Sequence, residues 1–246
     1  MAEFSELEER QQRTRLLVGD AGITRLRTAH VLVLGVGGVG AYAAEQLARA
    51  GIGRLTLVDG DRIERSNCNR QLPALTSTLG RPKAEVVAER ILEINPEAET
   101  IPVVDFIRDE KIDRLLETGF DYAIDAIDQL SPKVFFLLGC RKRRLPVISS
   151  MGSGGKSDPT QIRVADISKT FGCALARAVR TRLRDLGVSH GIRTVFSPEE
   201  VPKQAVRCWQ DPEGHNHSTV GTISYMPAAF GCVCASVALR DLLGYS

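Results

Sequence analysis

The stretch His30-Val-Leu-Val-Leu-Gly35-Val-Gly-Gly38-Val-Gly40-Ala-Tyr-Ala-Ala-Glu45, followed by Leu55-Thr-Leu-Val-Asp59, decides the fold of this chain. It predicts a buried strand, a glycine turn, a helix and a second strand that ends in a carboxylate. Nucleotide-binding α/β folds open in this order. A glycine pattern alone is weak, but four elements in register make the prediction specific.

Each glycine of this loop has a separate expected role. We expect a tight turn at Gly35, backbone access for phosphate at Gly37 and Gly38, and close packing of helix on strand at Gly40. The free amides and the positive end of the helix would then face the phosphate. Asp59 follows at a strand's carboxyl end, where its carboxylate can accept hydrogen bonds from a ribose.

Strands and helices continue to alternate as far as residue 150. The expected strands cover 31–34, 55–59, 100–105, 121–127 and 146–150, and the expected helices cover 41–50, 82–94, 109–117 and 132–143. This alternation predicts the α/β class, with a doubly wound and mostly parallel sheet covered by helices on both faces.

The pattern changes after Ser150. A glycine-rich turn (151–155) precedes an expected strand at 161–166, a helix at 172–186 and a loop-rich stretch to about 217. We therefore divide the chain into an ATP-binding core with an N-terminal arm (1–150) and an extension for substrate recognition and dimerisation (151–246). The two are expected to form one integrated domain.

Composition narrows the class of protein. The chain has 246 residues, 32 of them basic and 30 acidic, so any affinity for nucleic acid must come from local patches. Its start is charged and carries no apolar leader stretch. The six cysteines (68, 140, 173, 208, 232 and 234) have no framework spacing. We expect reduced thiols and a cytoplasmic protein.

One segment is uncharged for a length that could cross a bilayer. It runs from Ser218 to Leu239 and contains Pro227 and several hydroxyl groups. We favour a buried helix, at a subunit interface, over a membrane span. Peripheral membrane association stays open as the alternative.

Charged residues after the second strand favour ATP over a dinucleotide. Activation by ATP needs cations against a triphosphate and a carboxylate to hold Mg²⁺. Arg70, Lys83 and Asp128 supply that set from loops at one edge of the expected sheet. We assign all three to catalysis, with Asp128 as the Mg²⁺ ligand, because a hydride-transfer enzyme needs no such set.

These motifs resemble those of enzymes with the ubiquitin-activating-enzyme fold, a Rossmann-like family that includes activators of sulfur-carrier proteins. The resemblance implies an ATP site lined by residues from five separated elements. The candidate residues are Gly35, Gly37, Gly38, Gly40, Asp59, Asp61, Asn67, Asn69, Arg70, Gln71, Lys83, Asp128 and Gln129.

The resemblance also implies an N-terminal arginine that reaches a partner subunit's site. Arg13 is the first choice for this catalytic role and Arg10 the second. Two alternatives stay open: Arg13 could pair with the acidic stretch 6–9, and the loop charges around Asp61 could simply be solvated.

Sulfur-carrier activators usually carry two Cys-x-x-Cys pairs for structural zinc, and this chain has none. Cys232 and Cys234 would point in different directions on a helix, so no zinc is expected. A thiolate nucleophile should be exposed near positive charge. Cys173 and Cys208 have basic neighbours in sequence, although a packing or surface role is the simpler interpretation of each.

The second half resembles a narrower group, the tRNA threonylcarbamoyladenosine dehydratases. The similarity lies in Met151-Gly-Ser-Gly-Gly-Lys-Ser-Asp-Pro-Thr-Gln161, in Val164 to Thr170, in Pro132-Lys133 and in the helix at Leu175. It implies ATP-dependent closure of threonylcarbamoyladenosine beside the tRNA anticodon into a cyclic form, with loss of water. The threonyl carboxylate would be activated as an acyl-adenylate or an acyl-phosphate.

Partners follow from the same resemblance. It implies a tRNA substrate and, together with the uncharged C-terminal segment, a homodimer. Some relatives carry a cysteine where this chain has Asn216 or a neighbour, which puts a sulfur-transfer partner in doubt.

Arginines on one expected helix could hold RNA. Arg177, Arg180 and Arg184 share a helix face at spacings of three and four, and such a row can follow phosphates. The cluster 141–144 could instead complement a helix dipole. Trp209 is a candidate for base stacking, as are Phe171 and Phe196, for which core packing is the simpler interpretation.

Two other functions remain open. One is adenylation of a carrier protein that ends in Gly-Gly, against which the absent zinc pairs count. The other is a nucleotide-sensing or membrane-tethered scaffold, against which the set of Arg70, Lys83 and Asp128 counts.

Overall fold

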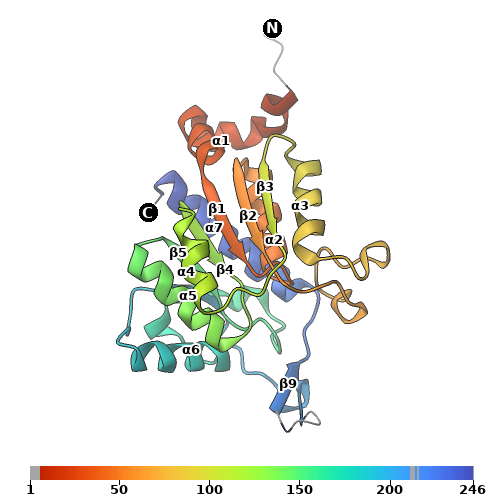
Figure 1. Cartoon of the computed structure of the whole chain (residues 1–246), viewed down its shortest axis with the longest axis vertical. Coiled ribbons are helices and arrows are strands. Elements are labelled where there is room, and N and C mark those ends of the chain that lie inside the picture. The colour runs from red at the N-terminus through yellow and green to blue at the C-terminus, as the bar shows by residue number, and fades with distance from the viewer. Residues whose placement is uncertain (1–5, 211–213, 215, 246) are drawn as a thin grey trace.

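The computed structural model describes residues 6–210, 214 and 216–245. Its first half contains the helix α1 before the strand–helix alternation begins (Figure 1). The elements are α1 (Glu6–Thr28), β1 (His30–Leu34), α2 (Gly40–Ala50), β2 (Arg54–Val58), α3 (Lys83–Ile94), β3 (Glu99–Val103), α4 (Glu110–Glu117), β4 (Tyr122–Asp125), α5 (Leu130–Arg143) and β5 (Val147–Ser150). Short 3-10 turns lie at Arg65–Asn67 and Thr76–Thr78.

The second half adds strands as well as helices. Its elements are β6 (Arg163–Asp166), α6 (Ala174–Asp185), β7 (Arg193–Phe196), β8 (Val206–Gln210), β9 (Asn216–Val220) and α7 (Tyr225–Leu243). Further 3-10 turns lie at Pro159–Gln161, Ile167–Lys169 and Lys203–Ala205.

Seven strands form one sheet in the order β3-β2-β1-β4-β5-β7-β6. All neighbours are parallel except β6, which runs antiparallel to β7. The expected α/β class and mostly parallel sheet are therefore confirmed. Because the strands are parallel, the carboxyl ends of β1, β2, β4 and β5 meet at one edge of the sheet, which is where ligands bind in this architecture.

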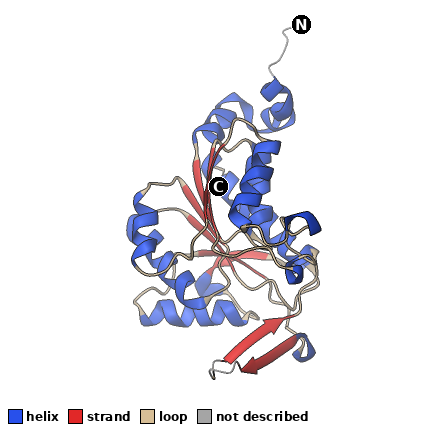
Figure 2. Ribbon diagram, turned by 45° about the vertical axis from the view of Figure 1, so that its right-hand side comes forward, coloured by secondary structure: helices blue, strands red, loops and turns tan. Residues whose placement is uncertain are grey.

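Helices cover both faces of the sheet, as Figures 1 and 2 show. Side chains of β1 alternate between the two layers. Val31 and Val33 join the core beneath α2, α3 and α7, whereas Leu32 and Leu34 join the core beneath α4 and α5. A strand buried on both faces explains the unbroken apolar run in the sequence.

The expectation that the alternation ends at Ser150 is wrong. After β6, the helix α6 leads to β7, which returns to the main sheet parallel to β5. This strand is only four residues long and begins with the exposed Arg193, so its sequence gives little strand signal. Most of the predicted elements are present, with ends that differ by a few residues.

The uncharged C-terminal segment is helical only from Tyr225, where α7 begins and packs along α2 and the sheet, whereas residues 218–220 belong to β9. Among the described residues, α7 is the one helix long and apolar enough to cross a membrane, and 50% of its most apolar window is buried. This agrees with the expected buried helix. Its exposed side includes Cys232 and Ser236.

Candidate functional site

The turn at Gly35 and the packing at Gly40 have the predicted geometry, whereas phosphate access at Gly37 and Gly38 stays a prediction. Gly35 has a φ of +87°, which favours glycine, and it makes the turn out of β1. A Cβ added at Gly40 would lie 1.8 Å from the carbonyl oxygen of Gly35, so the first residue of α2 must lack a side chain. No side chain caps α2 at Val39. The start of this helix is therefore a suitable position for an anion.

The packing at Gly40 gives a direct test. Gly40→Ala is expected to lower the free energy of unfolding by about 1–3 kcal/mol, because the loop must move to admit the methyl group. Gly37→Ala is the matched control, since its added Cβ would lie 3.5 Å from the nearest atom, in Gln71. Urea unfolding of both variants measures the difference. Equal stabilities would show that Gly40 is not needed for packing.

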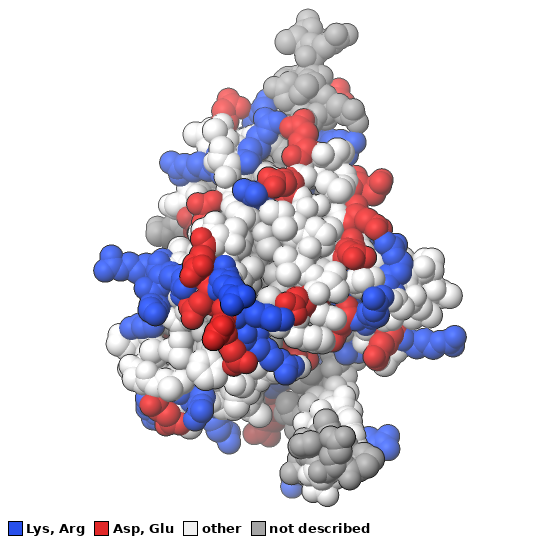
Figure 3. Space-filling view, in the orientation of Figure 1, with Lys and Arg blue, Asp and Glu red and all other residues white. Residues whose placement is uncertain are grey.

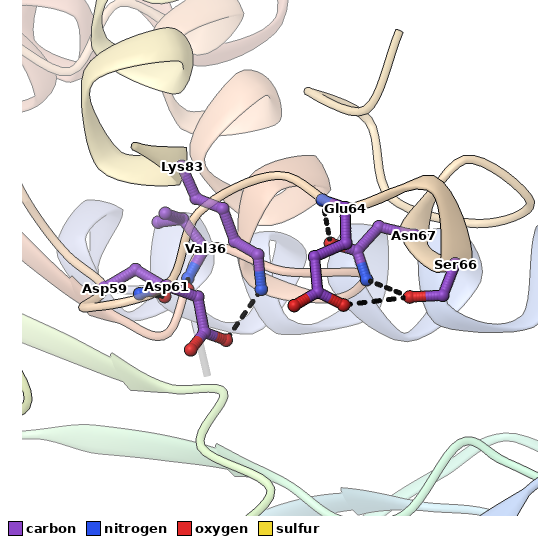
Figure 4. Close-up of polar contacts among 7 residues, drawn as sticks. All are labelled: Val36, Asp59, Asp61, Glu64, Ser66, Asn67 and Lys83. Atoms are coloured by element: carbon purple, nitrogen blue, oxygen red, sulfur yellow. Dashed lines mark hydrogen bonds and ion pairs between the residues drawn. The ribbon is translucent and has the colours of Figure 1, made fainter. Parts of the chain in front are cut away.

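A carboxylate pair and a lysine lie beside the loop. Oδ2 of Asp59 accepts a hydrogen bond from the amide of Val36 at 2.9 Å, and its Oδ1 accepts one from the amide of Asp61 at 2.9 Å. The Nζ of Lys83 lies 2.7 Å from Oδ2 of Asp61 (Figure 4). Burial raises the pKa of Asp59, although the Lys83 charge opposes the shift. Asp61 is thus paired and is not simply a solvated loop charge.

Asn67 stabilises the turn that carries the next candidates. Its Oδ1 accepts a hydrogen bond from the amide of Glu64 at 3.1 Å, and its Nδ2 lies 3.4 Å from the hydroxyl of Ser66 (Figure 4). Asn67 is buried. The side chain predicted to line the ATP site therefore holds the shape of this loop.

Arg70 and Asn69 form a linked pair. Nη1 of Arg70 donates to the carbonyl oxygen of Ser66 and to Oδ1 of Asn69, both at 2.9 Å. Nδ2 of Asn69 donates at 3.0 Å to the carbonyl oxygen of Thr222. Nearby, Oε1 of Gln71 is buried without a hydrogen-bond partner, and its amide group borders Gly37. An unsatisfied acceptor beside a phosphate loop fits a site that is completed by a ligand.

The loop after β4 presents Asp128 and Gln129. Asp128 is exposed, and Gln129 precedes α5 and accepts a hydrogen bond through Oε1 from Nη2 of Arg108 at 3.1 Å. Arg108 also lies over the Phe106 ring. The ring of Phe106 approaches Gly60, where an added Cβ would lie 2.7 Å away. Sequence reasoning missed Phe106 and Arg108, although their position just beyond an expected strand end was a usable signal.

A buried ion pair stabilises the segment that leads from β4 to Asp128. Lys133 and Asp125 have side chains that are 0% exposed, and Nζ of Lys133 lies 2.7 Å from Oδ2 of Asp125. The hydroxyl of Ser149 donates to the same oxygen at 2.6 Å. Oδ1 of Asp125 accepts a hydrogen bond from the amide of Ile127 at 3.1 Å. This cluster was also missed, because Lys133 has the sequence appearance of a surface residue.

The glycine-rich turn after β5 is held by a buried lysine. Nζ of Lys156 donates to the carbonyl oxygens of Glu199 and Gly172. The carboxylate of Glu199 accepts hydrogen bonds from the amides of Ser157 and Asp158 at 2.9 and 3.0 Å. Burial lowers the pKa of Lys156. The sequence placed Lys156 in the motif shared with the dehydratases without a role for it, and Glu199 was not predicted.

Arg13 does not join the other candidates. It is exposed on α1, which leads directly into the amino end of β1 at the opposite edge of the sheet (Figure 1). Arg10 donates to the carbonyl oxygen of Ile94 at 3.3 Å. Neither arginine can reach the glycine loop of its own chain from this position, so only a partner's site could use them.

The expected row of three exposed arginines on α6 is not what the structure shows. Arg180 is half-buried, and its Nη1 donates to the carbonyl oxygen of Thr170 at 2.8 Å and to the side chain of the same residue. It anchors the turn before α6. Arg177 and Arg184 are exposed as expected, and a hollow of about 450 Å³ between α6 and Leu130 is lined by Arg177 and Arg182.

Cysteines do not gather into a metal site. Among the described residues, His, Cys, Asp and Glu form no group of three or more that could hold a metal ion. Cys232 is exposed whereas Cys234 is buried, so the two face different surroundings. Cys173 is buried at the start of α6, and Cys208 is exposed on β8.

Comparison with known proteins identifies a family and relatives that match nearly the whole chain. Residues 9–246 match the ThiF family. The chain is 40% identical over 240 residues to the tRNA threonylcarbamoyladenosine dehydratase of Bacillus subtilis, covering 94% of this chain and 93% of that protein. It is 39% identical over 246 residues to the Escherichia coli dehydratase, covering 94% and 92%.

A solved structure agrees in fold. The crystal structure of the Escherichia coli dehydratase TcdA in complex with ATP matches with a TM-score of 0.89 and 37% identity, over 99% of this chain and 98% of that one. Another structure of the same protein holds AMP. The nucleotide loop and the charged residues described above therefore lie in a fold whose relative binds adenine nucleotides.

Proposed function

The chain belongs to the ThiF family, and we propose that it is an ATP-dependent tRNA-modifying enzyme that dehydrates threonylcarbamoyladenosine to its cyclic form. The observation that carries the proposal is the meeting of the glycine loop, Arg70, Lys83 and Asp128 at one edge of the sheet. Similarity to the dehydratases extends over nearly the whole chain and supports the same substrate.

The chemistry needs an activated carboxylate. A threonyl carboxylate oxygen attacks a phosphorus of ATP and forms a mixed anhydride, which releases pyrophosphate if the product is an acyl-adenylate or ADP if it is an acyl-phosphate. The carbamoyl nitrogen then attacks the acyl carbon, loses its proton and closes the ring, and AMP or phosphate leaves with the carboxylate oxygen. Because nitrogen and carbon belong to one substituent, closure needs correct orientation more than an enzyme nucleophile.

The residues of the site can stabilise the negative charge that develops on the phosphate groups during the reaction. The amides at the start of α2 hold phosphate oxygens, and the ammonium of Lys83 and the guanidinium of Arg70 stabilise the charge of the leaving group. Both cations are already oriented, Lys83 by Asp61 and Arg70 by Asn69. A preoriented cation costs no reorganisation during the reaction.

We propose that Mg²⁺ accompanies the nucleotide. Magnesium in such sites needs only one or two carboxylates, with phosphates and water as its remaining ligands. The exposed carboxylate of Asp128 fits that requirement, and Asp61 is the nearest acidic neighbour of Lys83. When bound, the ion neutralises phosphate charge.

Thiol chemistry has little support at α7. Burial raises the pKa of Cys234 to about 12 and also raises the pKa of Cys232. Both shifts disfavour the thiolate form, which is the nucleophile. A sulfur-transfer partner would have to use Cys68, Cys208 or Cys232, which are the exposed cysteines. The direct cyclisation above uses none of them.

We also propose a homodimer that acts in the cytoplasm. Leu16 and Leu17 on α1 are 84% and 82% exposed, and such side chains are usually covered in an assembled protein. Arg13 lies on the same helix. Arg13 can reach a partner's nucleotide site only in a dimer whose interface includes this helix.

Mass spectrometry of nucleosides tests the function. Transfer RNA that carries threonylcarbamoyladenosine is incubated with the protein, ATP and Mg²⁺, then digested. We expect the modified adenosine to lose the mass of one water, and no change in samples without ATP or without protein. Unmodified product together with carrier-dependent pyrophosphate exchange would assign the protein to carrier activation instead.

A further inference from the structure

Strands β8 and β9 form a two-stranded ribbon that projects from the body of the protein (Figures 1 and 2). All five residues of β8 are exposed. A two-stranded ribbon is marginally stable alone in water. This one is anchored at its foot, where Gly221 accepts a hydrogen bond from the amide of Gly155 at 2.8 Å and donates one to Ala205 at 2.7 Å.

The two faces of the ribbon differ. Side chains alternate along a strand, so Arg207 and Trp209 share one face, and the register adds Thr219 opposite Arg207. We call these three residues the outer ribbon face. Val220 belongs to the other face and lies against Gly154, where an added Cβ would be 3.1 Å away. The outer ribbon face therefore points away from this contact, with Trp209 47% exposed.

The ribbon starts at the nucleotide edge of the sheet. Thr222, two residues beyond β9, accepts the hydrogen bond of Asn69, which also holds Arg70. A substrate that reaches the site from this side passes the ribbon. Figure 3 shows basic side chains on both sides of it.

We infer that the outer ribbon face binds the tRNA substrate, with Trp209 stacked on an unpaired base and Arg207 paired with a phosphate. The inference rests on the proposed function. Exposed aromatic rings stack on splayed bases of RNA loops, and arginine supplies charge for the backbone. The segment 203–220 has two basic residues, Lys203 and Arg207, and two acidic residues, Asp211 and Glu213, which lie outside the described residues. The choice of RNA as the occupant therefore rests on the exposed ring of Trp209, on Arg207 beside it and on the position of the ribbon at the nucleotide edge.

The fluorescence of Trp209 gives the first test. It is the only tryptophan in the chain, so intrinsic emission reports on this face alone. Titration with threonylcarbamoylated tRNA is expected to quench the emission saturably, whereas ATP alone leaves it unchanged. Emission that depends on protein concentration without RNA would assign the face to a second copy. Unchanged emission while filter binding shows a complex would overturn the inference.

Variants give the second test. Trp209→Ala is expected to raise the Kd for tRNA about 5–150-fold, whereas Trp209→Phe, which keeps an aromatic ring, stays within about threefold. The KM for tRNA should rise in parallel, with kcat at saturation and the KM for ATP unchanged. If Trp209 served only the folding of the ribbon, Trp209→Phe would not keep the affinity for tRNA near the wild-type value.

The salt dependence of tRNA binding tests the role of Arg207. Arg207→Gln should reduce the slope of log Kd against log salt by about 0.7–0.9, the value for one phosphate contact. Arg114→Gln, on the exposed surface of α4, is the matched control and should leave the slope unchanged. Cyclisation by the wild-type protein decides the proposed function separately. Normal cyclisation with unchanged tRNA binding in all the ribbon variants would overturn this inference alone.

Discussion

Asp128→Ala is expected to lower kcat about 10²–10³-fold, the loss that follows removal of one group from a phosphoryl-transfer clamp. Asp128 lies at the carboxyl edge of β4 and is exposed, so it is available to hold Mg²⁺ against the nucleotide. Among the contacts of the described residues, none gives Asp128 a structural role. Stability should therefore change by less than about 0.5 kcal/mol.

The measurement is turnover against Mg²⁺ concentration, with unfolding followed in parallel. Asp128→Glu keeps the carboxylate and should recover part of the activity at raised Mg²⁺. Glu93→Ala removes an exposed carboxylate from α3 and is the matched control, with activity unchanged. Unchanged turnover in Asp128→Ala would remove this residue from the site.

Lys133→Met should lower the free energy of unfolding by about 3–5 kcal/mol, because it leaves the buried carboxylate of Asp125 without its counter-charge. Both side chains are 0% exposed, so water cannot replace the ammonium. Asp125 also accepts the amide hydrogen bond of Ile127, which shapes the loop before Asp128. The loss of stability should therefore be accompanied by a loss of activity.

Urea denaturation of single and double variants isolates the pair. In Asp125→Asn/Lys133→Met neither partner is charged, and part of the stability should return. Arg54→Met breaks a surface ion pair with Glu99 at 3.0 Å and should cost less than about 1 kcal/mol. If the double variant is no more stable than Lys133→Met, an isolated buried charge is not the cause of the loss.

The local sequence pattern was sufficient to predict the nucleotide-binding half of the fold. The apolar runs of β1 and β2 and the glycines between them have one compatible arrangement, and the contacts of Gly35 and Gly40 confirm it. The roles of Arg70, Lys83 and Asp128 toward ATP stay predictions. Their positions at one edge follow from the parallel order of the strands.

The remaining features depend on contacts between distant segments. Arg180 has the same sequence signal as Arg177, and only the turn at Thr170 distinguishes the two. Lys133, on α5, is buried because Asp125 on β4 and Ser149 on β5 approach it from the sheet. The ribbon escaped prediction because β8 is exposed on every residue and shows no apolar alternation.

The amide group of Asn69 gives the ribbon and the nucleotide loop a shared hydrogen-bond network. One end of it accepts from Arg70 and the other donates to Thr222. If RNA on the outer ribbon face displaces Thr222, the support of Arg70 changes with it and the two binding events are thermodynamically linked. In that case RNA alters the affinity for ATP by the same factor as ATP alters the affinity for RNA. This connection offers a route by which nucleotide consumption could be limited to molecules that already hold their substrate.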